Sequence, residues 1–115
     1  MEELLTRQEF KEQVFKRTSG KCCVPGCTKE AVDAHHILDR GLWKDGGYYL
    51  SNGAALCSSH HLEAEHGNIT PLDCMEYMGI SVDDIRLPGK LADVFSGPEE
   101  YKEAMKLGII DKWGK

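Results

Sequence analysis

The sequence predicts a small zinc-stabilised α+β domain, and three observations support this fold class. Helix start and stop signals stand on both sides of the middle of the chain, over residues 6–18 and 70–107. Between them, residues 21–56 lose the helical period and are punctuated by glycines, which is typical of a β-hairpin with a long connection. All five histidines and four of the five cysteines lie between Cys22 and His66. That concentration favours a metal-binding centre in the hairpin region.

The composition fits one domain. The 115 residues are 41% hydrophobic and 29% charged, which leaves little room for a second compact unit. We expect a single domain over residues 1–115 that consists of an N-terminal helix (1–20), a zinc-braced centre (21–67) and a helical extension (68–115). No run approaches the roughly 20 apolar residues of a membrane span, and the acidic, polar start is unlike a secretory signal. We therefore expect a cytoplasmic protein without a membrane partner.

The charge of the chain is negative overall but unevenly distributed. The formal net charge is −5, which excludes the uniformly basic surface of proteins that coat nucleic acid. Residues 5–44 hold eight Lys or Arg against five Asp or Glu, whereas residues 45–115 hold six against twelve. A split of this size is most often ordinary solvated surface. Any contact with nucleic acid is therefore expected to be local or assisted by a metal ion.

The first helix is predicted over residues 6–17. Thr6 and Glu9 form a T-x-x-E capping box, and Phe10 and Val14 then supply the apolar face. The exposed side of this helix carries four basic residues, which are Arg7, Lys11, Lys16 and Arg17. These charges suit either plain solvation or contact with phosphate groups.

Turn and cap signals place the later elements. The Asp-Gly-Gly sequence at 45–47 indicates a turn, because glycine tolerates the positive φ angles of tight turns. A short helix is expected over residues 58–66 and a second over 70–78, where Pro71 occupies the first helical position. The last helix is predicted over 96–107.

Two ligand pairs, in the segments CCVPGC and CSSHH, predict a structural zinc site. The odd cysteine count and the lack of a secretory signal favour metal ligation over disulfides. The two pairs stand some 30 residues apart, as in tetrahedral zinc sites. The expected ligands are Cys22, Cys27, Cys57 and His60, although the spacing also admits Cys23 in place of Cys22. Four protein ligands leave a zinc ion no open position for substrate, so the expected role is structural. The alternative is that these cysteines are buried and free, without a metal.

A second group of side chains suits a divalent ion and a general base. His35 and His36 are adjacent in a short extended segment, so their rings point to opposite faces. One imidazole can then bind a metal while its neighbour accepts a proton near neutral pH. His61 and Glu65 stand four apart on a predicted helix and share a face, which suits two ligands of one ion. Asn52 lies between these two groups in the chain.

The stretch DAHHILDRGLWKDGGYYLSNGAALCSSHH resembles the HNH endonuclease family, and in particular the small HNH proteins of phages and prophages. The resemblance covers roughly residues 15–66 and implies a ββα-metal motif inside a pair of zinc knuckles. It assigns His36 as the general base and His35 as a ligand of the catalytic metal. It also assigns Asn52 as the residue that braces the loop and orients the base.

The resemblance assigns the last metal ligands to the second helix. His61, directly after the last zinc ligand, matches the final metal-binding histidine of the family. A further ligand about four residues later falls on Glu65, and His66 is the alternative at this position. The third ligand is expected to be Glu65, because a residue four positions after His61 lies on the same face of the helix. His66 is the alternative ligand, or a contact for phosphate.

The function that this resemblance implies is metal-dependent hydrolysis of phosphodiester bonds in double-stranded DNA, by nicking or full cleavage. His36 would activate a water molecule, and Mg2+ or Mn2+ would stabilise the developing charge. A bacterial or phage-infected cell is the expected setting, with a targeting protein as a second partner. Two alternatives stay open: a catalytically silent zinc-stabilised module that binds DNA or a protein, and an RNA nuclease.

Overall fold

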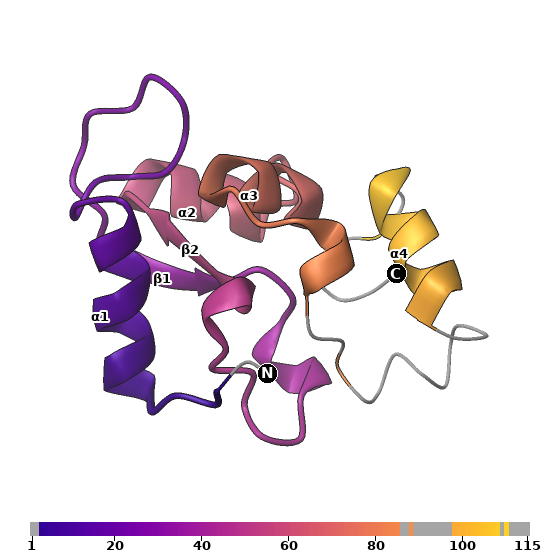
Figure 1. Ribbon diagram of the computed structural model, residues 1–115. Coiled ribbons are helices and arrows are strands. Elements are labelled where there is room, and N and C mark those ends of the chain that lie inside the picture. The colour runs from indigo at the N-terminus through magenta and orange to yellow at the C-terminus, as the bar shows by residue number, and fades with distance from the viewer. Residues whose placement is uncertain (1–2, 86–87, 89–97, 109, 111–115) are drawn as a thin grey trace.

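The computed structural model describes residues 3–85, 88, 98–108 and 110 (Figure 1). These residues form four α-helices and one two-stranded antiparallel sheet, so the predicted α+β class is confirmed. In chain order the elements are α1 (Arg7–Arg17), β1 (Asp33–His36), β2 (Gly53–Leu56), α2 (Ser58–Glu65), α3 (Pro71–Met78) and α4 (Pro98–Lys106). Short 3-10 turns at Arg40–Leu42, Leu50–Asn52 and Val82–Asp84 lie in the connections.

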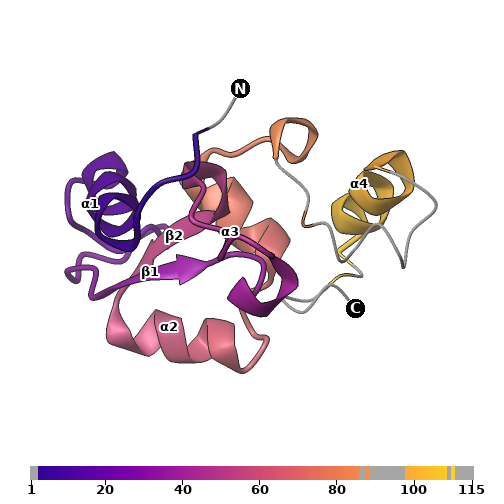
Figure 2. The same ribbon diagram turned by 90° about the horizontal axis from the view of Figure 1, so that it is seen from below.

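The sheet lies between two helices. β1 and β2 run antiparallel, with Asp33 opposite Leu56 and His36 opposite Gly53. In Figure 2, α1 lies against one face of this hairpin and α2 against the other. Successive side chains of a strand point to opposite faces, so β1 sends neighbouring residues toward different helices.

The α1 helix begins as the sequence predicts. The Glu9 backbone N–H donates to Thr6 Oγ1 at 3.1 Å, and the Thr6 backbone N–H donates to Glu9 Oε1 at 3.0 Å. These bonds satisfy N–H groups that a helix start otherwise leaves without partners. Phe10 and Val14 are buried one turn apart on the face that packs on the sheet. This packing is close, because a Cβ added to Gly53 of β2 would lie 2.4 Å from Val14 Cγ2.

Cap signals also mark the ends of α2 and α3. The α2 helix ends at Glu65, one residue earlier than predicted, and Gly67 follows with a φ of 83°. The α3 helix begins at Pro71 as predicted, after a capping box. The last predicted helix corresponds to α4, and its expected start at residue 96 lies outside the described residues. None of the described helices combines the length and the apolar character needed to cross a bilayer.

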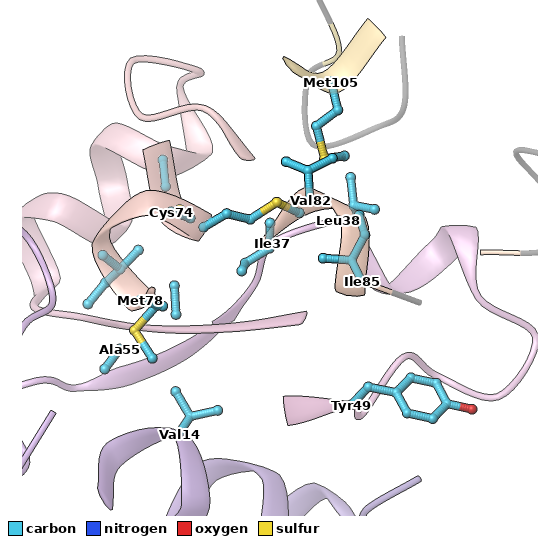
Figure 3. Packing of buried hydrophobic residues seen from close by; sticks show 14 of the residues in the cluster. Val14, Ile37, Leu38, Tyr49, Ala55, Cys74, Met78, Val82, Ile85 and Met105 are labelled. Atoms are coloured by element: carbon cyan, nitrogen blue, oxygen red, sulfur yellow. The ribbon is translucent and has the colours of Figure 1, made fainter. Parts of the chain in front are cut away.

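One cluster of buried side chains joins α1, the sheet, α3 and α4 (Figure 3). Its members include Val14 of α1, Ala55 of β2, Cys74 and Met78 of α3, and Met105 of α4. All four residues of β2 are buried, and they are glycine, two alanines and a leucine. Small residues in a strand let neighbouring elements approach closely. The hairpin is therefore clamped between helices, which gives the residues of β1 and α2 fixed positions.

Candidate functional site

Two clusters of metal-ligating side chains share one short helix, α2. The first contains Cys22, Cys27, Cys57 and His60, and the second contains Asp33, His35 and His61. Within each cluster the ligand atoms lie within 4.8 Å of one another. His60 and His61 are consecutive in α2, so their side chains leave the helix about 100° apart. One turn of α2 therefore serves both clusters.

The cysteine cluster has the dimensions of a tetrahedral metal site. Nδ1 of His60 lies 3.2 Å from the sulfur of Cys57 and 3.4 Å from that of Cys22. The sulfurs of Cys27 and Cys57 are 4.0 Å apart. A tetrahedral zinc ion, with bonds of about 2.3 Å to sulfur and about 2.0 Å to nitrogen, separates its ligands by roughly 3.5–3.8 Å. The four side chains therefore lie close enough to hold a metal such as zinc.

A tight turn brings the first two cysteines of this cluster together. The Cys27 backbone N–H donates to the Val24 carbonyl at 3.0 Å, and Gly26 has a φ of 81°. With Pro25 before that glycine, the segment has the features of a type II turn, in which proline sets the first φ and glycine permits the positive one. Cys23 is not in the cluster, and its backbone N–H donates to Ala55 of β2. Of the two adjacent cysteines, the geometry thus favours Cys22 as the ligand.

The Cys57 thiol is suited to lose its proton to a metal. Burial raises the pKa of Cys57, but hydrogen bonds outweigh that effect and hold the pKa at about 7. The donors are the backbone N–H of His60, the thiols of Cys22 and Cys27, and the His60 ring. Cys57 is also the N-cap of α2, where the helix dipole favours negative charge. The thiolate is the form of cysteine that binds metals.

The second cluster joins β1 to α2, and the carboxylate of Glu65 lies beside its two imidazoles. His61 Nε2 lies 3.2 Å from Asp33 Oδ2 and 3.3 Å from Glu65 Oε1. The same Glu65 oxygen lies 3.8 Å from Nδ1 of the buried His35. Asp33 and His35 share a face because they are two apart on a strand, and His61 and Glu65 share a face because they are four apart on a helix. Imidazole and carboxylate ligands together suit a divalent transition ion.

Asp33 is the member of this cluster that the sequence did not identify. It stands at the start of the D-A-H-H-I segment, and its spacing of two from His35 on a strand is the signal that would have found it. For the alternative between Glu65 and His66, the distances bring Glu65 to both histidines. His66 is exposed at the C-cap of α2, and a spacing of five from His61 turns it away from the shared face.

His36 points to the other face of β1, toward α1. Its ring stacks on Phe10 with centroids 5.0 Å apart and meets the edge of Tyr48 at 5.1 Å. His36 Nε2 lies 3.1 Å from the Gly46 carbonyl oxygen. A carbonyl only accepts hydrogen bonds, so this contact assigns the hydrogen of the neutral ring to Nε2 and leaves the lone pair on Nδ1. Burial lowers the pKa of His36, an effect that the Gly46 carbonyl opposes and the charge of Arg40 reinforces.

Asn52 holds the connection between the two strands. Its buried amide accepts a hydrogen bond from the Leu38 N–H at 2.9 Å and donates to the carbonyls of Leu38 at 3.1 Å and Gly47 at 3.3 Å. Gly47 follows Gly46, whose carbonyl contacts His36. The amide of Asn52 therefore fixes the backbone that in turn fixes the imidazole of His36.

No family model, curated protein or solved structure matches this chain. Its chemistry is therefore inferred from the arrangement of its own side chains. The decisive feature is that β1 carries a ligand of the second cluster at His35 and a braced imidazole at His36, on opposite faces.

An open pocket of about 240 Å³ lies beside β1 on the side of α1. It is lined by Arg7, Phe10, Lys11, Asp33, Ala34, His36, Arg40 and Tyr48. Asp33 belongs both to this pocket and to the carboxylate–imidazole cluster. A group bound in the pocket can thus reach the imidazole of His36 and the edge of the cluster together.

Proposed function

We propose that this protein is a metal-dependent endonuclease or nickase of the HNH type that hydrolyses phosphodiester bonds in double-stranded DNA. The observation that carries this proposal is the opposed orientation of two neighbouring histidines. His35 joins a cluster of metal ligands, whereas His36 enters a pocket that reaches the same cluster through Asp33. Hydrolysis of a phosphodiester needs a base that activates water and a positive charge that stabilises the phosphate. His36 on one face of β1 suits the first task, and a metal ion held by His35 on the other face suits the second.

A structural zinc ion would occupy the cysteine cluster. Cys22, Cys27, Cys57 and His60 supply three sulfurs and one nitrogen at separations that fit a tetrahedron. Four protein ligands leave no open position for water, so the role we assign to this site is structural. It ties the loop after α1 to the first turn of α2, which also carries His61.

The ligand set of the second cluster fits Mn2+ well and also admits Mg2+. Asp33 and Glu65 supply carboxylate oxygens, which both ions accept, and His35 and His61 supply nitrogens, which Mn2+ accepts more readily. A divalent ion at this site would supply positive charge for the scissile phosphate and for the departing 3′ oxygen. The protein's contribution is to hold these four ligands on one face of β1 and on successive turns of α2.

His36 is the residue that we assign as general base. Its Nε2 hydrogen is engaged by the Gly46 carbonyl, so Nδ1 is the atom that accepts a proton from water. The oxygen of that water forms the new bond to phosphorus, and the bond from phosphorus to the 3′ oxygen breaks. The hydrogen bond from the Asn52 amide to the Gly47 carbonyl braces the backbone next to Gly46, whose carbonyl contacts the His36 ring.

Plasmid cleavage tests the proposal. We compare wild type, His36→Gln and His66→Gln, each with Mn2+ or Mg2+, and measure bound zinc per chain on all three. Glutamine at 36 retains a donor for the Gly46 carbonyl but has no basic nitrogen, so we expect roughly a hundredfold or greater loss of cleavage, in line with general-base catalysis. His66→Gln changes an exposed histidine at the C-cap of α2 and serves as the matched control.

Two results would contradict the proposal. If wild type carries zinc but cuts neither DNA nor RNA with any divalent ion, the fold serves as a binding module. If His36→Gln cuts as fast as wild type, His36 is not the base. Parallel assays on single-stranded RNA decide whether the substrate is RNA, because the phosphodiester chemistry itself does not depend on the sugar.

A further inference from the structure

Three cations line the pocket beside His36 and take part in neither metal cluster. Arg7 and Lys11 come from α1, and Arg40 comes from the 3-10 turn after β1. None of the three forms a side-chain hydrogen bond or ion pair with another residue in the part of the chain that the structure describes. Lys11 Nζ does lie 5.7 Å from the ring centroid of Phe15. The positive side of the pocket is therefore available to an anion.

The charge of this pocket differs from that of the whole chain. The protein has 19 acidic residues against 14 Lys and Arg, yet the carboxylate in the pocket lining is Asp33, which faces His61. The pocket thus has a negative end at the ligand cluster and a positive side at α1. A polyanion that reached the cluster would extend toward the cations.

Arg7 and Lys11 also line a second surface depression on α1. That depression is lined by Arg7, Gln8, Lys11, Glu12 and Phe15, and the Glu12 carboxylate accepts a hydrogen bond from Gln8 at 3.0 Å. Arg7 and Lys11 are four apart, so they stand one above the other on the helix surface. Both side chains therefore border the pocket and the depression. A phosphate on either side of them could contact these two cations.

We propose that Arg7, Lys11 and Arg40 bind backbone phosphates that flank the cleaved one, on the α1 side of His36. This inference rests on the proposed function for the identity of the cleaved phosphate. The flanking contacts would make a polynucleotide strand the substrate, in preference to a small phosphodiester or a mononucleotide. Contacts of this kind carry no base sequence information, and they make binding strongly dependent on salt.

The test measures DNA binding as a function of salt. The protein is the full, zinc-loaded chain with His36→Gln, so that the DNA stays intact, and the probe is a 16-base-pair DNA duplex. We compare it with chains that also carry Arg7→Gln and Lys11→Gln, or Lys16→Gln and Lys29→Gln. The second pair removes the same charge from exposed positions outside the pocket lining.

Loss of two phosphate contacts lowers the slope of log Kd against log salt by about two. We expect that change, with Kd raised about tenfold or more near 0.1 M salt, for the Arg7 and Lys11 pair and not for the control pair. In chains with His36 present, we expect kcat/KM for DNA to fall at least about fivefold more than kcat/KM for bis(p-nitrophenyl) phosphate, which has no flanking phosphate.

The outcomes separate this inference from the proposed function. Equal salt slopes for both pairs of substitutions would overturn it. Equal losses for DNA and for the small diester would also overturn it, because the cations would then act on the cleaved phosphate itself. If the slope falls as expected but wild type cuts no nucleic acid, the phosphate contacts stand and the nuclease proposal fails.

Discussion

His61 Nε2 lies 3.2 Å from Asp33 Oδ2, which links the fourth residue of α2 to the first residue of β1. The two residues are 28 positions apart in the chain, and the hairpin together with the first turn of α2 brings them into contact. Glu65 approaches the same nitrogen from the next turn of the helix, at 3.3 Å. Two carboxylates thus lie next to one imidazole nitrogen. A divalent ion bound among them would have all three groups as ligands.

Removal of the Asp33 carboxylate should weaken metal binding. We expect Asp33→Asn to raise the Kd for Mn2+ by about tenfold or more, since changes around metal ligands commonly have effects of this size. Isothermal titration of the zinc-loaded protein with Mn2+ measures the change. Glu30→Gln, at an exposed position away from the cluster, is the control that should bind as wild type does. An unchanged Kd for Asp33→Asn would remove Asp33 from the ligand set.

Adjacent cysteines should differ in their importance for zinc. Cys22 lies in the cluster and Cys23 does not, so we expect Cys22→Ala to lose the metal and Cys23→Ala to keep one zinc ion per chain. Because zinc binding contributes folding free energy outright, Cys22→Ala should lower Tm by more than about 10 °C, equivalent to a few kcal/mol at this size. Elemental analysis and thermal unfolding check both variants. Zinc retained by Cys22→Ala and lost by Cys23→Ala would reverse the assignment.

The features that the sequence predicted well are set by residues close together in the chain. The capping box of Thr6 and Glu9 acts within one helical turn, and it starts α1 where expected. The opposite orientation of His35 and His36 follows from strand geometry alone. In both cases the energetic preference of a short segment agrees with the final fold, so local reasoning is sufficient.

The features that the sequence left open depend on packing between distant segments. Whether Cys22 or Cys23 joins the cluster is decided by the turn at residues 24–27 and by the contact of Cys23 with Ala55 of β2. The place of Asp33 in the second cluster depends on how β1 sits against α2. Likewise, Arg7 and Arg40 come together at one pocket only because α1 packs on the hairpin.

The amide of Asn52 should contribute strongly to stability. It makes three buried hydrogen bonds to backbone groups of Leu38 and Gly47. Its removal takes these bonds from the N–H and the carbonyl of Leu38, whereas the Gly47 carbonyl still accepts from the Tyr49 N–H at 2.9 Å. We expect Asn52→Ala to lower the free energy of unfolding by about 2–4 kcal/mol, as measured by urea denaturation. Asn68→Ala removes an exposed amide that bonds to Glu63, and should change stability by less than about 0.5 kcal/mol.

Asn52→Asp separates the donor from the acceptor functions of this side chain. Aspartate keeps an oxygen for the Leu38 N–H but cannot donate to the carbonyls of Leu38 and Gly47. We therefore expect it to be no more stable than Asn52→Ala, because a buried carboxylate would then face two carbonyl oxygens. A stability equal to that of wild type would mean that the amide donors do not brace the connection.

Close contact between α1 and β2 should make Gly53 intolerant of a side chain. A Cβ at this position would lie 2.4 Å from Val14 Cγ2 and 2.9 Å from the ring of Phe10. We expect Gly53→Ala to cost about 1–3 kcal/mol, the usual range for overpacking a core. In a Val14→Ala background the closest contact is gone, so the loss of stability should be smaller. The difference between the two backgrounds measures the coupling between the two positions.

Because Phe10 also stacks on His36, displacement of α1 by the new methyl group should reduce DNA cleavage as well as stability. Equal losses of stability in both backgrounds would show that the contact with Val14 is not what requires glycine at this position.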